Sequence, residues 1–151
     1  MPINGYAATY TKVQVQSTQS KEDILLLLFE EAIRRSRHAK EGIEANNPKE
    51  RGENISRALA IISELDCSLD RTLETEMVEN LSGLYQFMIH QLTQANFKND
   101  ASALESVIAI LKDLHEAFHQ AAAQTRKSGD QNHPAPAPAE RKAEGGLCVA
   151  V

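Results

Sequence analysis

Large apolar side chains recur at spacings of three and four residues along most of this 151-residue chain. Such spacing places them on one side of an α-helix, facing a core. Four segments show it, from about residue 21 to 45, from 47 to 69, from 75 to 98 and from 102 to 118. Their predicted core positions are Leu25, Leu28, Phe29, Ala32, Ser36, Ala39 and Ile43; Ile55, Leu59, Ile62, Leu65 or Asp66, and Leu69; Met77, Leu81, Leu84, Tyr85, Met88, Leu92 and Ala95; and Leu104, Val107, Ile108, Leu111, Leu114 and Phe118.

Residues that favour helix starts stand before three of these segments. Ser20 precedes the first, Asn47 with Pro48 opens the second, and Ser102 with Glu105 forms a capping box for the fourth. Short polar connections join the segments, and four amphipathic helices so joined bury their apolar faces by packing antiparallel around one core. We therefore predict an all-α fold, an antiparallel up-and-down four-helix bundle.

The ends of the chain differ from the helical part in composition. Residues 1–19 lack helical periodicity and contain the alternating stretch TKVQVQ, so we expect an extended N-terminal arm. After Arg126 the sequence becomes rich in proline, alanine, glycine and charge, which predicts a disordered C-terminal tail over residues 128–151. The predicted single domain is the helical bundle of residues 20–127, in which Cys67 is expected to be a small core residue.

Some apolar side chains lie outside the predicted core faces. Ile24 and Leu27 fall beside the stripe of the first helix, in a run of six large apolar residues from 24 to 29. The other such positions are Ala58 and Ile61 on the second helix and the strip Asn80, Gly83, Leu84 and Phe87 on the third. A wide apolar face is compatible with ordinary bundle packing. Together, however, these residues predict a surface that a partner covers.

Charge and hydropathy restrict the kind of partner. A formal net charge of -5 argues against nucleic acid or an anionic membrane, both of which favour a concentrated positive surface. No apolar run approaches the roughly 20 residues that a membrane-spanning helix requires, and the N-terminus lacks the pattern of a signal peptide. We expect a cytoplasmic protein with no membrane insertion.

The sequence HEAFH, formed by His115, Glu116 and His119, has the spacing of a zinc-protease motif. Two imidazoles four residues apart on a helix can bind zinc, with the glutamate as general base. A third ligand is missing, and so is the second Glu-x-x-His pair that a two-iron site would require. A small zinc metallopeptidase remains the alternative hypothesis, whereas the main prediction is a non-enzymatic protein without a metal or other cofactor.

Several separated motifs give the chain a resemblance to the FliS family of flagellin export chaperones. They are Tyr6 and Tyr10 in the arm, Ser17 to Ser20 before ILLLLFEEAI, NISRALAIISELDCSLD from Asn54 to Asp70, NLSGLYQFM from Asn80 to Met88, and QANFKND from Gln94 to Asp100. The resemblance covers residues 6–118. One departure is Phe118, where the family usually has tryptophan near the end of the last helix.

The resemblance implies a cytoplasmic helical bundle that binds the disordered C-terminal segment of flagellin, keeps it unpolymerised and presents it to the flagellar type III export gate. It also implies that Tyr6 and Tyr10 in the arm can cover the client groove. We expect client contacts from the surplus apolar residues, with Asn54, Arg57 and Asn80 as polar guides. A bundle with no client is a third hypothesis, and it predicts no binding at all.

Overall fold

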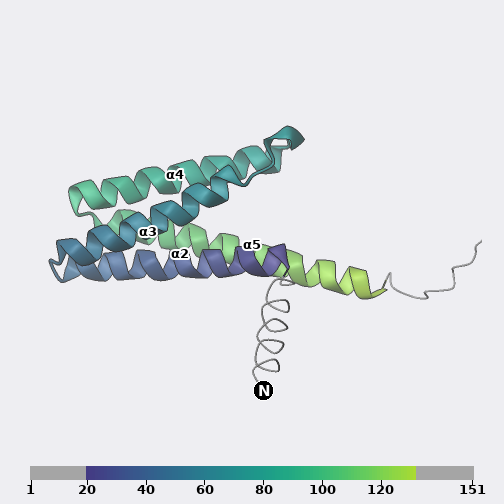
Figure 1. Ribbon diagram of the computed structural model, residues 1–151, viewed down its shortest axis with the longest axis horizontal. Helices are drawn as coiled ribbons and strands as arrows, with labels where there is room; N and C mark the ends of the chain where they lie inside the picture. The colour runs from purple at the N-terminus through teal and green to yellow at the C-terminus, as the bar shows by residue number, and fades with distance from the viewer. Residues whose placement is uncertain (1–19, 132–151) are drawn as a thin grey trace, which may run out of the picture. The chain divides into compact units, whose positions relative to one another are not determined.

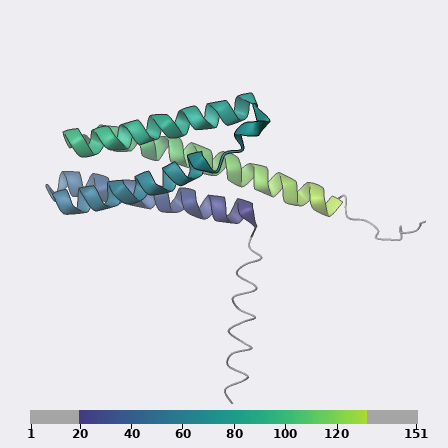
Figure 2. The same cartoon turned by 45° about the horizontal axis from the view of Figure 1, so that its top comes forward.

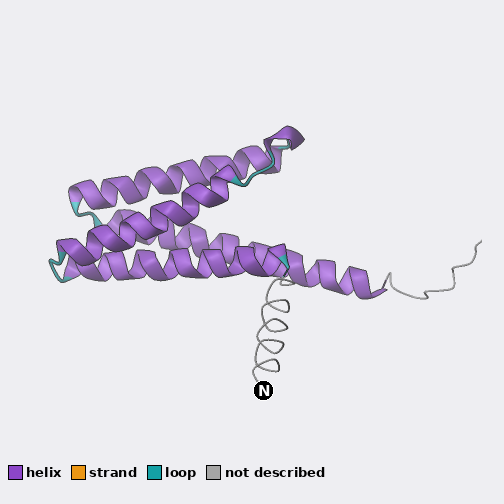
Figure 3. Cartoon of the chain, in the orientation of Figure 1, coloured by secondary structure: helices purple, strands orange, loops and turns teal. Residues whose placement is uncertain are grey.

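The computed structural model describes residues 20–131, and Figure 3 shows helices joined by short loops over this range. Residues 1–19, with Tyr6 and Tyr10, and residues 132–151 lie outside the described part. The helices are α2 (Lys21–Glu44), α3 (Pro48–Cys67), α4 (Glu76–Lys98) and α5 (Ala101–Gln131), with a short 3-10 helix, η1 (Arg71–Leu73), between α3 and α4. The predicted all-α bundle is confirmed, and among residues 20–131 no helix has the length and apolar character needed to cross a bilayer.

The predicted helix starts are confirmed for α2 and α3. The Ser20 side chain accepts the backbone N–H of Asp23, and the Asn47 side chain accepts that of Glu50, with Pro48 in the first turn of α3. The capping box predicted at Ser102 is wrong, because the capping residue stands two positions earlier, at Asp100. There the Asp100 carboxylate accepts the Ser102 backbone N–H at 2.9 Å and the Ser102 hydroxyl at 2.6 Å, so α5 already begins at Ala101.

Neighbouring helices run antiparallel, as side-chain contacts along their lengths demonstrate. Between α2 and α3, Arg35 reaches Asn54, and Gly42 approaches Arg51. Figures 1 and 2 show α3 beside α2 and also beside α4. The pairs between α3 and α4 are Arg51 with Asn96 and Asp66 with Ser82. The pairs between α2 and α5 are Lys40 with Glu105 and Glu30 with His115. In each case the residue number rises on one helix as it falls on the other.

The core is formed by the predicted stripes, with some corrections. Its largest buried side chains are Phe29, Ile55, Ile62, Tyr85, Met88, Leu92, Leu104, Val107 and Leu111. Met77, predicted in the core, is 62% exposed. Cys67, expected to be a core residue, is exposed. Both residues stand in an end turn of a helix. Periodicity predicts the direction of such a side chain, but a neighbouring helix must also extend far enough to cover it.

Helix α5 continues to Gln131, past the expected start of the tail at residue 128. The chain divides into two compact units within this helix, after Glu116. The first unit contains α2, α3, α4 and the part of α5 up to Glu116, which together supply the surfaces considered below. The second unit contains the rest of α5.

The Ser36 hydroxyl is buried in the core and has no hydrogen-bond partner among the described residues. A buried, unpaired hydroxyl costs free energy, and alanine also has the higher helix propensity. Ser36→Ala is therefore expected to raise the free energy of unfolding by about 1 kcal/mol, measured by urea denaturation. The matched control is Ser63→Ala on the exposed face of α3, which should gain roughly 0.5 kcal/mol or less, from propensity alone. A less stable Ser36→Ala variant would contradict this interpretation.

Candidate functional site

Apolar side chains on the first two turns of α2 are open to solvent. Ile24 is 47% exposed and Leu27 is 51% exposed. Helix α2 needs the residues on its opposite side, including Phe29 and Ala32, to build the core, and both of these are completely buried. The prediction that Ile24 and Leu27 fall outside the core face is confirmed.

A hollow of about 460 Å³ lies between the start of α2 and the end of α3. Its apolar lining is Ile24, Leu25, Leu28 and Leu65, and its polar lining is Lys21, Glu64 and Ser68. Leu25 and Leu28 were expected in the core, but they are half-buried and form part of this wall. Ile24 is thus one side of a depression that an apolar side chain from another molecule can enter.

The residues predicted on α3 lie on the side of the helix that faces α2, but they differ in exposure. Two residues mark the side of α3 that faces α2: Asn54 bonds to α2, and Leu65 lines the hollow between the two helices. Ala58 and Ile61 lie between them in the chain at helical spacing, and so on the same side. Ala58 is completely buried, so its assignment to a binding surface is wrong. Ile61 is half-buried and Arg57 is exposed. We call Ile24, Leu27, Ile61 and the hollow the α2–α3 surface.

Asn54, predicted to guide a client, is a structural residue of the bundle. It is 4% exposed. Its Oδ1 accepts from Arg35 of α2 at 3.2 Å, and its Nδ2 donates to the Glu50 carbonyl at 2.8 Å and the Glu50 carboxylate at 3.0 Å. With these bonds made, Asn54 ties α3 to α2, and the assignment to a client surface is corrected. Arg35 is itself held by Glu31, whose pKa is lowered by hydrogen bonds and charge from Arg34 and Arg35.

A second apolar surface lies on α4. Ser82 and Gln86 bond to Asp66, so they mark the side of α4 that faces α3. Leu84 follows Ser82 by two residues, about 200° around the helix, and therefore points away from α3. Phe87 is one turn further along and 45% exposed, Leu84 is half-buried, and Asn80 is exposed. We call Asn80, Leu84 and Phe87 the α4 strip. It lies on a different side of the bundle from the α2–α3 surface.

Among residues 20–131, three other large apolar side chains are exposed, none of which was predicted from the sequence to lie on the surface. Leu73 is 59% exposed, Met77 is 62% exposed and Phe97 is 86% exposed. Phe97 falls outside the core stripe of α4, so its angular position gave the signal that could have identified it. Met77 precedes Leu84 by two turns and extends the line of the α4 strip toward η1.

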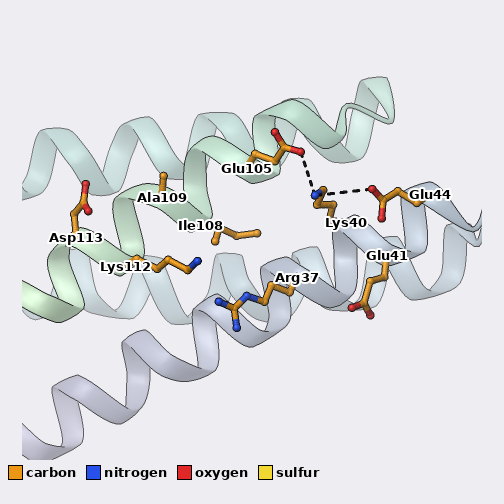
Figure 4. A pocket seen from close by; sticks show the side chains of 9 residues that line it. All are labelled: Arg37, Lys40, Glu41, Glu44, Glu105, Ile108, Ala109, Lys112 and Asp113. Atoms are coloured by element: carbon orange, nitrogen blue, oxygen red, sulfur yellow. Dashed lines mark ion pairs between the residues drawn. The ribbon is translucent and has the colours of Figure 1, made fainter.

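Charged side chains dominate a second hollow, of about 590 Å³, between α2 and α5 (Figure 4). Lys40 lies 3.1 Å from Glu105 and 3.9 Å from Glu44, and the hydrogen bond and charge of Glu105 raise the Lys40 pKa. The basic lining residues are Arg37, Lys40 and Lys112, and the acidic ones are Glu41, Glu44, Glu105 and Asp113. Because three basic and four acidic side chains nearly balance in this lining, its charge favours neither an anion nor a cation strongly, and we assign no ligand to this hollow.

The HEAFH segment lies on α5, and its first histidine faces α2. His115 Nε2 lies 3.1 Å from Glu30 Oε1, which gives this ring a role in the contact between α2 and α5. Within residues 20–131, no cluster of three or more histidine, cysteine, aspartate or glutamate side chains could hold a metal ion. The third ligand that the zinc hypothesis requires is therefore not supplied by the described residues.

Comparison with known proteins finds one family repeatedly. The family model of flagellar protein FliS matches residues 2–125. A Vibrio cholerae protein named flagellar secretion chaperone FliS is 35% identical over 121 residues, which are 78% of this chain and 89% of the relative. The protein of the same name from Salmonella typhimurium is 36% identical over 115 residues, 74% of this chain and 85% of the relative.

A solved structure is similar in fold. It is described as the crystal structure of a flagellar chaperone from bacteria, with a TM-score of 0.66 and 18% sequence identity, and the match covers 72% of this chain and 88% of the other. A Bacillus subtilis protein named flagellar secretion chaperone FliS is 32% identical over 120 residues, 78% of this chain and 89% of the relative. On the family match and these identities, the chain belongs to the FliS family of flagellar proteins.

Proposed function

We propose that this chain is a flagellar export chaperone that binds the disordered C-terminal segment of flagellin in the cytoplasm. It keeps that segment from polymerising and presents it to a component of the flagellar export gate. The relatives named flagellar secretion chaperones support this function. The single observation that carries it is the solvent exposure of Ile24, Leu27 and Phe87 on a bundle whose core is already complete. The function involves no chemical step on the client.

The exposed areas set how much of the surface a client must use. Full burial of a large apolar side chain contributes roughly 1.5 to 3 kcal/mol. Because Ile24, Leu27 and Phe87 are each about half exposed, covering all three supplies roughly 2 to 4.5 kcal/mol. Ordering a disordered segment costs about 2 to 5 kcal/mol or more. The three side chains together only about match that cost, and those of either surface alone fall short of it. The proposed client therefore contacts both surfaces and also fills the hollow beside Ile24.

The two surfaces also agree with the chemistry of a flagellin end segment that would otherwise self-assemble. An amphipathic client segment presents apolar residues at helical spacing, and the hollow beside Ile24 admits such a side chain. Arg57 on α3 and Asn80 on α4 are both exposed, and their side chains can bond to polar groups of the client. Covering the client's apolar residues in this way removes the contacts that drive its assembly.

The direct test is titration of the full chain with a synthetic C-terminal flagellin peptide in an isothermal calorimeter. We expect saturable binding at one peptide per chain, a negative heat-capacity change from apolar burial, and a gain in helical circular dichroism as the peptide orders. A scrambled peptide of the same composition is the control. Absence of binding, or equal binding of the scrambled peptide, would contradict the proposal and favour a bundle without a client.

A further inference from the structure

A buried carboxylate joins the end of α3 to the first half of α4. Asp66 is 7% exposed. Its Oδ1 accepts from the Ser82 hydroxyl at 3.0 Å and from the Arg71 guanidinium at 2.9 Å, and its Oδ2 accepts from the Gln86 side-chain amide at 2.7 Å. Arg71 in η1 also donates to Ser82 at 3.1 Å. We refer to Asp66, Arg71, Ser82 and Gln86 as the Asp66 cluster.

The geometry of the Asp66 cluster restrains α4 in two ways. Ser82 and Gln86 are four residues apart, about 6 Å along the helix axis, and each bonds to a different oxygen of the same carboxylate. A rotation of α4 about its axis, or a shift along it, would lengthen at least one of these bonds. Apolar packing is not directional in this sense. The cluster therefore restrains the rotation and axial position of α4 more sharply than the core contacts alone.

The restraint acts on the turns that carry the α4 strip. Leu84 lies between Ser82 and Gln86 in the chain, and Phe87 directly follows Gln86. Because the two bonding residues face α3 while the strip faces away, any rotation of α4 turns Leu84 and Phe87 toward or away from a bound segment. We propose that Asp66 is a positioning residue that holds the α4 strip in its client-binding orientation. This inference rests on the proposed function.

The Asp66 carboxylate has an opposite charge and hydrogen-bond donors beside it. Hydrogen bonds to charged groups are about twice as strong as neutral ones, and Arg71 supplies the opposite charge beside Asp66. The neighbouring Tyr85 is almost completely buried, and burial, followed by the negative charge of Asp66, raises its pKa to about 12. Asparagine in place of Asp66 would retain an acceptor for Ser82 but weaken the bond to Arg71.

The test measures affinity for the C-terminal flagellin peptide at a temperature where every variant is fully folded by circular dichroism. Asp66→Ala is expected to weaken binding about tenfold, and Asp66→Asn about threefold. Gln86→Ala removes one bond from an exposed side chain, with little risk to folding, and should weaken binding about threefold. Thr93→Ala is the control on the same helix, because its hydroxyl bonds to the Ile89 carbonyl within α4, and it should leave affinity unchanged.

A loss of stability alone could also weaken binding, and a second change distinguishes the two explanations. Gly52 has open space where a Cβ would stand, so Gly52→Ala stabilises α3 far from the α4 strip. In the double variant Asp66→Ala, Gly52→Ala, positioning predicts that stability rises above that of Asp66→Ala while the tenfold loss of affinity stays. Recovery of affinity together with stability would overturn the inference.

The same experiment distinguishes failure of this inference from failure of the proposed function. If the wild-type chain binds the peptide and the Asp66 and Gln86 variants bind equally well, the inference is overturned and the proposed function stands. If the wild-type chain binds no peptide, both are overturned. Loss of affinity in the Asp66 and Gln86 variants, with Thr93→Ala unchanged, supports positioning.

Discussion

Replacing Leu27 and Phe87 together with aspartate is expected to weaken binding of the C-terminal flagellin segment by about 100-fold or more. Each change places a charge where the proposed client puts an apolar residue, and a charge desolvated without a partner is costly. Leu27 and Phe87 are 51% and 45% exposed, so the unbound bundle should tolerate both substitutions. Ile61 is a poorer test because it is half-buried, and a charge there would also disturb the packing of α3 on α2.

The measurement is fluorescence anisotropy with a labelled peptide, accompanied by far-ultraviolet circular dichroism to verify the helices. Phe97→Asp is the matched control, since Phe97 is 86% exposed and belongs to neither surface. It should bind like the wild type. The single variants Leu27→Asp and Phe87→Asp should each lose part of the affinity, with free energies that add if one client contacts both distant surfaces. Unchanged affinity in the double variant, or an equal loss in Phe97→Asp, would remove the surface hypothesis.

The periodicity of apolar residues predicts well which side chains of a helix point toward the core and which point toward solvent. This is why much of the fold follows from the sequence. The side-chain period of an α-helix places Phe29, Tyr85 and Met88 inward and Leu27 outward without any knowledge of the neighbouring helices. The caps at Ser20 and Asn47 work locally, through bonds to a backbone N–H three residues ahead. Both kinds of information are contained within a few turns of one helix, so both predictions are confirmed.

The burial of flanking positions depends on the distance between two helices, which a single helical pattern does not contain. Asn54 and Ala58 stand beside the core stripe of α3, where a sequence pattern cannot tell surface from contact. In the structure both residues are buried because α2 approaches α3 closely on this side, with Gly42 against Arg51 and Arg35 bonded to Asn54. Ile61, on the same side of α3, is only half-buried.

The Asp66 cluster is likewise formed by contacts between helices that the pattern of one helix does not contain. The stripe of α3 passes through residues 65 and 66, and its periodicity does not determine which of them faces the core. Both are buried: Leu65 faces the hollow, and Asp66 faces α4. An aspartate near a core is acceptable only when donors from other elements satisfy it. Its partners, Ser82 and Gln86, lie 16 and 20 residues further along the chain, so only the tertiary structure identifies them.

Gly42→Ala is expected to destabilise the bundle by about 2 kcal/mol, although alanine is the better helix former by about 1 kcal/mol. A Cβ at this position would lie 2.7 Å from the Arg51 backbone nitrogen, 3.2 Å from the Arg51 Cα and 3.1 Å from the Glu50 Cβ. Two of these three atoms belong to the backbone and cannot rotate away. The helices α2 and α3 would have to separate, and that cost exceeds the gain in helix propensity.

The separation should also reach α4, because Arg51 donates to Asn96 at 3.2 Å and to Asn99 at 2.7 Å. Urea denaturation measures the effect, and the matched control is Gly52→Ala on α3. There a Cβ meets nothing within 4 Å, so the same substitution should stabilise by about 0.5 to 1 kcal/mol. The two glycine variants are thus expected to differ in sign. A Gly42→Ala variant as stable as the wild type would mean that α2 and α3 can move apart at no cost, and the close approach would then not explain why Asn54 and Ala58 are buried.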